Sequence, residues 1–284
     1  MESFAFVIHP LDPKQDVARK YPFLARVLPA ALIRLLARQW PPLLLSHVVG
    51  VRSRDDHQKH AEGWLLACPL TADQMLQLPP QVVYDKVVQT GRLAQRQGAG
   101  ILGLGAFTSV VGDGGVTVAQ RLNMPVTTGN SLTVGFAVEA LRRSAEHRGV
   151  DLERATAAVV GASGSIGLAC AEMLAPMVER LILVGRREIR LSQARAQAEA
   201  AGAAKVRIST DVGLVVEADM VLSATNTSQP ILYPHHLKRG AVVCDVALPP
   251  DVAPAVREER DDVLVVKGGV VTVPGSVDFG FDFG

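Results

Sequence analysis

The sequence predicts an α/β protein made of a small N-terminal α/β domain, a connector helix and a domain built on a doubly wound parallel sheet. After residue 150, short apolar runs alternate with helical segments, which is the pattern of parallel strands covered by helices on both faces. A glycine-spaced turn follows the first of these apolar runs, and a helical stretch lies before that run. We therefore expect an N-terminal domain over residues 1–128, a connector over 129–150 and a second domain over 151–284.

The N-terminal half contains strand-like runs and one long helical segment. The runs are short and apolar, and they comprise Phe4–His9, Leu43–Val51 and Gly63–Leu70. Residues 80–97 show helical periodicity that ends near Gly98. A further strand then runs into a glycine-rich loop. These elements predict a smaller α/β domain.

Composition argues against several classes of function. A formal net charge of +1 over 284 residues lacks the basic excess of a general nucleic-acid binder, so we expect no nucleic-acid partner. Cys68, Cys170 and Cys244 are too few and too scattered for a disulfide framework or a zinc site. The histidines show no metal-ligand spacing. We expect a cytoplasmic protein without a bound metal.

Neither export nor a membrane span is expected. The chain start lacks the basic and apolar regions of a secretory signal. The most apolar stretch, Val27–Val51, is interrupted by Arg34, Arg38, Pro41 and Pro42. It therefore cannot supply the roughly 20 uninterrupted apolar residues of a spanning helix.

The same region carries only one sign of charge. No acidic residue lies between Asp16 and Asp55, whereas basic residues recur there; those that we single out as partner-facing are Arg19, Lys20, Arg26, Arg34 and Arg38. Such a basic and apolar surface favours docking of an acidic protein or contact with an anionic membrane face. The alternative is a solvated helix face whose neutralising acids come from elsewhere in the fold.

The connector begins at Asn130 or Ser131, either of which suits an N-cap. Apolar residues then recur at helical spacing, and arginines gather towards the end, where they suit the helix dipole. Gly149 closes the segment. This pattern predicts a helix between the two α/β units.

The glycine-spaced turn predicts a nucleotide site. Gly161, Gly164 and Gly167 stand between an apolar strand and a helical segment. In a Rossmann-type domain, such glycines allow a tight turn, the approach of backbone to a pyrophosphate and close packing of helix on strand. The free N–H groups of the helix N-terminus then face the phosphates. We expect cofactor contacts from these glycines and from Ser163, Ser165 and Ile166.

The end of the second strand indicates which cofactor is bound. An NAD site normally offers an acidic residue there for the ribose 2′-hydroxyl, but this sequence offers Arg186 and Arg187, and Glu188 comes later. Guanidinium groups suit a 2′-phosphate, which favours NADP(H). The alternative is a pair of ordinary exposed arginines.

Further polar loops are candidates for contact with cofactor or substrate. Ala224 and Thr225 follow the fourth strand, where they would neighbour the ribose and nicotinamide unless this loop is a plain polar turn. The substrate-cleft candidates lie on two other loops, and they are Thr108, Ser109, Thr128 and Asn130. We expect these two loops to line a cleft between the domains, with helix capping and turn formation as the alternative.

The ordered motifs GAFTSVVGDGG, TTGNSLTVGFAVEAL, AVVGASGSIGLACAEML and VVKGGVV resemble those of the long-chain acyl-carrier-protein reductases, especially the bacterial relatives outside the cyanobacteria. FAFVIHPLD and EGWLLACPL match as well, so the resemblance covers nearly the whole chain. It implies reduction of a fatty acyl thioester to an aldehyde by NADPH through an acyl-cysteine, with acyl carrier protein as the partner.

The sequence departs from that family at the nucleophile. The family's cysteine lies in a C-terminal segment beyond VVKGGVV, and no cysteine follows Cys244 here. We therefore expect a chain that lacks the nucleophile segment, and its catalytic residues stay unknown. Free cysteines of this kind are mostly buried; Cys68 is the first suspect for a reactive one.

Two alternative functions stay open. The first is a shikimate-dehydrogenase-like enzyme that oxidises or reduces a small hydroxy or carbonyl compound, because such proteins share the plan of a small domain, a helix and a Rossmann domain. The absence of an obvious Lys–Asp or His–Asp pair near TTGNS counts against it. The second is a non-catalytic NADP(H)-binding module.

Overall fold

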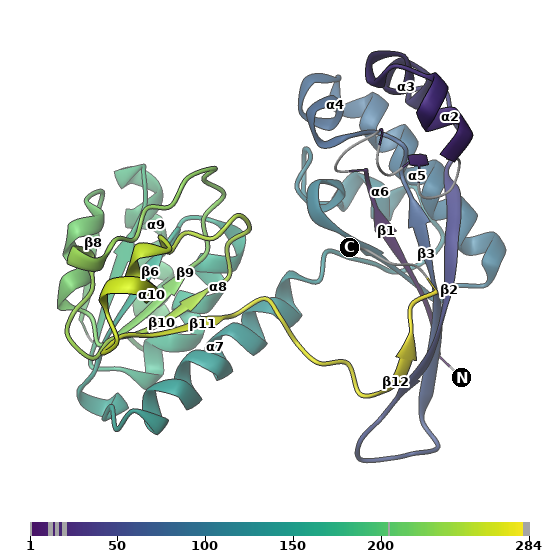
Figure 1. The fold of residues 1–284 in the computed structure, drawn as a ribbon. Helices are drawn as coiled ribbons and strands as arrows, with labels where there is room; N and C mark the ends of the chain where they lie inside the picture. Colours follow the sequence, from purple (N-terminus) through teal and green to yellow (C-terminus); the bar gives the residue numbers. More distant parts are fainter. Residues whose placement is uncertain (1, 11–13, 15–16, 19–21, 204, 281–284) are drawn as a thin grey trace. The chain divides into compact units, whose positions relative to one another are not determined.

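The computed structural model describes residues 2–10, 14, 17–18, 22–203 and 205–280. The chain forms two compact units (Figure 1). The first unit comprises Met1–Gly129 and Thr272–Gly284, and the second comprises Asn130–Val271. Of the helices described, none has the length and apolar character needed to cross a membrane.

The second unit is built on six parallel strands in the order β11-β10-β9-β6-β7-β8. The chain starts in the middle of the sheet, winds to one edge and returns to build the other, as in a doubly wound fold. The strands are β6 (Thr156–Val160), β7 (Arg180–Val184), β8 (Val206–Ser209), β9 (Met220–Ser223), β10 (Val242–Asp245) and β11 (Leu264–Lys267). The predicted fold class is confirmed.

Helices cover this sheet. The α-helices are α7 (Asn130–His147), α8 (Ser165–Leu174), α9 (Glu188–Ala200) and α10 (Ala255–Glu259), and the 3₁₀ helices are η2 (Leu152–Arg154), η3 (Ala175–Met177), η4 (Val212–Glu217) and η5 (Pro234–His236). All residues of β6 and β9 are buried, because both faces of the central strands are covered. Apolar side chains therefore occupy successive positions in these strands.

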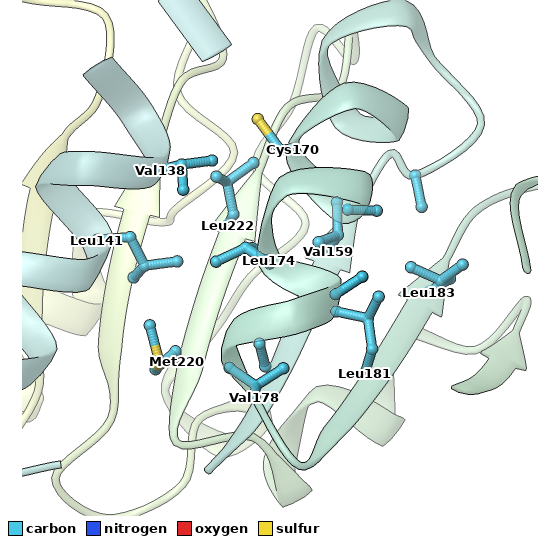
Figure 2. Close-up of a cluster of buried hydrophobic side chains, with 14 of the residues drawn as sticks. Val138, Leu141, Val159, Cys170, Leu174, Val178, Leu181, Leu183, Met220 and Leu222 are labelled. Atoms are coloured by element: carbon cyan, nitrogen blue, oxygen red, sulfur yellow. The ribbon is translucent and has the colours of Figure 1, made fainter. Parts of the chain in front are cut away.

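The core on one face of the sheet joins α7 and α8 to the strands. Figure 2 shows Val138 and Leu141 of α7 and Leu174 of α8 gathered with Met220 and Leu222 of β9. Each of these side chains is almost fully buried. Burial of a large aliphatic side chain contributes about 1.5–3 kcal/mol, so this cluster anchors α7 firmly to the sheet.

The first unit has a mixed sheet in the order β12-β2-β3-β1-β4-β5. β1 lies parallel to β3 and β4, and β4 lies parallel to β5, whereas β2 is antiparallel to both β3 and β12. The strands are β1 (Glu2–Ile8), β2 (Leu43–Arg52), β3 (His60–Ala67), β4 (Ile101–Leu104), β5 (Val126–Thr127) and β12 (Gly275–Asp278). The three predicted strands at the start of the chain are confirmed.

The helices of the first unit are α2 (Pro22–Val27), α3 (Ala30–Ala37), α4 (Ala72–Gln77), α5 (Pro80–Gln97) and α6 (Val116–Gln120), with 3₁₀ helix η1 at Ala106–Ser109. The helix predicted over residues 80–97 is confirmed. It begins with Pro80 in its first turn, where the missing N–H has no cost. It ends at Gly98, whose φ of 86° suits glycine.

The two units divide the chain differently from the predicted domains in two respects. Helix α7, predicted as a separate connector, belongs to the second unit because its apolar face is buried against that sheet. Residues 272–284, predicted to belong to the nucleotide domain, belong instead to the first unit. Strand β12 pairs with β2 there, and Gly275, with a φ of +103°, permits the close approach of the two backbones.

Candidate cofactor site

The glycine turn joins β6 to α8 at the carboxyl end of the central strand. The N–H groups of Gly161 and Ala162 both donate to Val184 O, at 2.9 and 3.1 Å. Gly161 has a φ of +85°, and a Cβ atom there would lie 2.5 Å from Ala224 O. Glycine is therefore required at this position by conformation and by space.

The other two glycines have different surroundings. A Cβ atom on Gly167 would overlap the carbonyl group of Gly161, so this glycine lets α8 pack directly on the turn. Gly164 is exposed and has a φ of −84°. The nearest atom to a Cβ atom on it would be Gly161 O, at 3.3 Å. Gly164 is thus the glycine that leaves room for an approaching phosphate.

The N-terminus of α8 can receive an anion. Leu168 N donates to Gly164 O at 2.9 Å, and no side chain caps this helix. The preceding N–H groups, of Ser165, Ile166 and Gly167, belong to the first turn, which has no intrahelical acceptors. The Asn130 side chain donates to Ser165 Oγ at 3.3 Å, so α7 contributes a polar group beside this turn. These residues fit the pyrophosphate of a dinucleotide.

Two arginines follow β7. Arg186 and Arg187 are exposed, and within the described part of the chain neither forms an ion pair. A Cβ atom on the preceding Gly185 would lie 3.4 Å from Ser163 Oγ. The glycine turn therefore places a hydroxyl group close to the point where the two guanidinium groups emerge.

The loop after β9 lies against the same turn. Ala224 N donates to Val160 O at 3.0 Å, and Thr225 Cγ2 lies 3.1 Å from the position of a Cβ atom on Gly161. Strands β6 and β9 are neighbours at the point where the strand order reverses, which is where dinucleotides bind in such sheets. The structure thus brings Ala224 and Thr225 next to the glycine turn.

Sequence reasoning missed Asp251, which organises this loop. Its carboxylate accepts hydrogen bonds from Ser223 Oγ at 2.6 Å, from Thr225 N at 3.0 Å and from Thr225 Oγ1 at 2.5 Å. Thr227 Oγ1 lies 3.1 Å from the same carboxylate. Asp251 is fully buried. The available signal was an acidic residue directly after Pro249 and Pro250, but its partner loop lies 24–28 residues earlier in the chain.

Asp245 is a second buried carboxylate at the end of β10. It accepts hydrogen bonds from Ala247 N at 3.0 Å and Val252 N at 2.9 Å. Burial raises the pKa of Asp245, and the negative charge of Asp251 acts in the same direction. The segment between these two aspartates contains a cis peptide bond at Leu248–Pro249.

The three cysteines are core residues. Cys68, Cys170 and Cys244 have no exposed surface. Burial raises the pKa of the Cys68 thiol to about 11 and those of the Cys170 and Cys244 thiols to about 12. A thiol must ionise to act as a nucleophile. None of the three, Cys68 included, is therefore set up for acyl transfer.

The four substrate-cleft candidates divide between the two units. Thr108 Oγ1 donates to Gly105 O at 2.7 Å and Ser109 Oγ donates to Ala106 O at 2.6 Å, as expected of hydroxyl groups in a turn. Thr128 also lies in the first unit, and Asn130 lies in the second. The role of these residues in binding a substrate stays a prediction.

The basic surface predicted near the N-terminus is present in part. Arg26, Arg34 and Arg38 are exposed on and beside α2 and α3, and Arg19 and Lys20 lie outside the described residues. Large apolar side chains are exposed there too; the described ones are Phe23, Val27, Leu32, Leu35 and Leu36.

The described residues contain no group of His, Cys, Asp and Glu placed to hold a metal ion.

Comparison with known proteins supports a reductase-type cofactor domain. The family model described as shikimate / quinate 5-dehydrogenase matches residues 143–266. The chain is 32% identical to "Aminotransferase PigE" of Serratia sp. over 77% of its length, and 31% identical to "Long-chain acyl-[acyl-carrier-protein] reductase" of Synechococcus elongatus over 66%. It is 27% identical to "Glutamyl-tRNA reductase" of Marinobacter nauticus over 78%.

The chain spans only part of these relatives. It covers 26% of the aminotransferase, 55% of the acyl-carrier-protein reductase and 50% of the glutamyl-tRNA reductase. The matched family model and the doubly wound sheet with its glycine turn agree on the cofactor class. The second unit is an NAD(P)-binding domain of the Rossmann type that is similar to the shikimate / quinate 5-dehydrogenase family model, and the chain is similar to parts of proteins named as acyl-carrier-protein and glutamyl-tRNA reductases.

Proposed function

We propose that this chain is the NADP(H)-binding part of a reductase that converts fatty acyl thioesters of acyl carrier protein into fatty aldehydes. The observation that carries the proposal is the glycine turn at Gly161 with Arg186 and Arg187 emerging close to Ser163. The similarity to a protein named as an acyl-carrier-protein reductase supports the substrate class. The glutamyl-tRNA reductase supports it too, since both names describe reduction of an acyl group joined to a carrier.

The preference for NADP(H) follows from charge. A 2′-phosphate carries negative charge that a ribose hydroxyl lacks, and guanidinium groups without ion-pair partners can bind it through paired hydrogen bonds. In the described residues, Arg186 and Arg187 have no such partner. The acidic residue that would favour NAD is not found at this position, because Glu188 begins the following helix.

The chemistry divides between the cofactor and the chain. When bound, NADPH would supply the hydride that, with one proton, converts the thioester into an aldehyde and a thiol and leaves NADP⁺. The chain's own residues hold the pyrophosphate at α8 and the 2′-phosphate at Arg186 and Arg187. In the proposed route the acyl group reaches the hydride donor as an acyl-cysteine. Because the three cysteines of this sequence are buried, the acylated cysteine is proposed to be one that this sequence does not contain.

The carrier is proposed to dock on α2 and α3. Three exposed arginines and five exposed large apolar side chains among the described residues there offer a positive surface with an apolar component, which complements an acidic protein that carries a lipid. Exchanging Arg34 and Arg38 for Glu should weaken binding of acyl carrier protein, with a loss that shrinks at high salt. Arg92 and Arg96, exposed on α5, provide the matched control pair. Equal loss in both pairs would contradict this docking site.

A small thioester tests the reaction without depending on a cysteine of the protein. Octanoyl-N-acetylcysteamine reproduces the thioester of an acylated cysteine side chain. Mixed with the 284-residue chain and NADPH in a single turnover, it should yield one octanal for each NADPH oxidised. Absence of octanal above the protein-free reaction, with NADPH bound, would overturn the proposed reaction and leave a nucleotide-binding module.

The matched family model favours a second candidate, an NADP-dependent dehydrogenase of a small hydroxy compound. Such an enzyme needs a proton acceptor beside the hydroxyl group. Reduction of NADP⁺ on addition of shikimate or quinate, in the absence of any thioester, would establish this candidate in place of the first.

A further inference from the structure

We infer that Asp251 is a positioning residue that holds the Ser223–Thr227 loop in the shape that receives the nicotinamide half of the dinucleotide. This inference rests on the proposed binding of NADP(H). It starts from a buried carboxylate whose hydrogen-bond donors, among the described residues, come from a loop that lies against the glycine turn.

The loop occupies most of the hydrogen-bonding capacity of the Asp251 carboxylate. An ionised carboxylate offers about four acceptor positions, and three donors of Ser223 and Thr225 lie within 2.5–3.0 Å of it. Thr227 Oγ1 lies within reach of both Asp251 Oδ1 and Gln229 O. Within the described residues, Asp251 has no cationic partner. A buried carboxylate of this kind is stable only when such donors bind it. The same hydrogen bonds therefore stabilise the carboxylate and hold the conformation of the loop.

The backbone of Asp251 is itself held in place. Its carbonyl oxygen accepts hydrogen bonds from Ile231 N at 2.8 Å and Leu232 N at 2.9 Å. The next residue, Val252, forms a β-bridge with Leu232. The carboxylate is therefore a fixed point, and the loop after β9 takes its shape from it.

The position of the loop connects Asp251 to the cofactor site. Ala224 O and Thr225 Cγ2 lie 2.5 and 3.1 Å from the position that a Cβ atom on Gly161 would occupy. A dinucleotide crosses a doubly wound sheet at its switch point, with one nucleotide on each half. The half that contains Arg186 and Arg187 follows β7, so the loop after β9 serves the nicotinamide half.

This division between the halves gives a selective test. Asp251→Asn should weaken binding of NADPH about tenfold, an order set by a buried charge-assisted hydrogen bond. It should change the affinity for adenosine 2′,5′-bisphosphate, which lacks the nicotinamide half, less than twofold. Both dissociation constants are measured by calorimetry on the 284-residue chain. Thr225→Val, which removes one hydroxyl donor to Asp251, should move the same ratio in the same direction if Asp251→Asn fails to fold.

Asp219 supplies the matched control. It stands at the opposite end of β9, where its carboxylate accepts a hydrogen bond from Thr156 N at 2.9 Å and pairs with Lys238 Nζ at 2.5 Å. Asp219→Asn should lower the melting temperature without changing the ratio of the two dissociation constants. That ratio separates positioning of the cofactor loop from a general loss of structure.

The outcomes separate this inference from the proposal on which it rests. If the unchanged chain binds neither ligand, the proposed cofactor binding is wrong. If the unchanged chain binds both ligands, and the Asp251 and Thr225 variants bind each ligand as tightly as the unchanged chain does, Asp251 does not position the loop. Equal weakening of both ligands by these variants would also overturn the inference, because it would assign Asp251 a purely structural role.

Discussion

A Cβ atom on Gly161 would lie 2.5 Å from the carbonyl oxygen of Ala224. The turn after β6 and the loop after β9 are therefore in direct contact, and this contact requires a glycine. The two elements that we assign to the pyrophosphate and to the nicotinamide half are therefore packed against each other.

We expect Gly161→Ala to destabilise the second unit. The residue has a φ of +85°, which costs a residue with a Cβ atom roughly 1–3 kcal/mol, and the contact with Ala224 adds to this. Binding of NADPH should be lost as well. Thermal unfolding and a nucleotide titration measure the two effects.

Gly164→Ala is the comparison for that variant. Gly164 has a φ of −84°, which alanine adopts readily, and the nearest contact of the new methyl group would be 3.3 Å. We expect a change of less than about 1 kcal/mol in stability and weaker binding of NADPH. Similar destabilisation by the two substitutions would contradict the assigned difference between the glycines.

We expect all three cysteines to resist thiol reagents in the folded protein. Their pKa values of about 11 to 12 leave almost no thiolate at pH 8, and the side chains have no exposed surface. Reaction with 5,5′-dithiobis(2-nitrobenzoic acid) should release no thiolate signal until guanidinium chloride unfolds the chain. Rapid modification of Cys68 in the folded state would restore it as a candidate nucleophile.

The ion-pair cluster on α7 predicts a pH dependence of stability. Hydrogen bonds from Arg142 and then Arg143 lower the pKa of Glu139 from 4.5 to about 2. A depressed carboxyl pKa contributes stability above the unfolded value and loses it as the pH falls through the folded value. The melting-temperature difference between the unchanged chain and Glu139→Gln should be largest above pH 5 and should shrink from pH 4.5 towards pH 2. A difference independent of pH would contradict this assignment.

The sequence was sufficient to predict the elements that are marked by residues close to one another in the chain. Helix α5 was predicted with its bounds, because periodicity and Gly98 mark it. The Gly161 turn was predicted because its spacing stands between a strand and a helix. These features depend on residues that are neighbours in the chain, so one sequence contains the information.

Features that depend on distant contacts were not predictable in this way. Asp251 acts on a loop 24–28 residues away, and nothing in its own neighbourhood identifies Ser223 and Thr225 as partners. Strand β12 pairs with β2 although more than 200 residues separate Gly275 from Val51. Helix α7 was predicted as a helix, but its membership of the second unit depends on which sheet buries its apolar face.

We propose that the second unit selects NADPH through Arg186 and Arg187. A fluorescence titration of the 284-residue chain with NADPH and with NADH, repeated on the variant with both arginines changed to Gln, tests this selection. We predict that NADPH binds at least about tenfold more tightly than NADH. The variant should lose this preference and keep its affinity for NADH. Equal affinity of the unchanged chain for the two nucleotides, or a preference that survives the double substitution, would contradict selection of NADPH by Arg186 and Arg187.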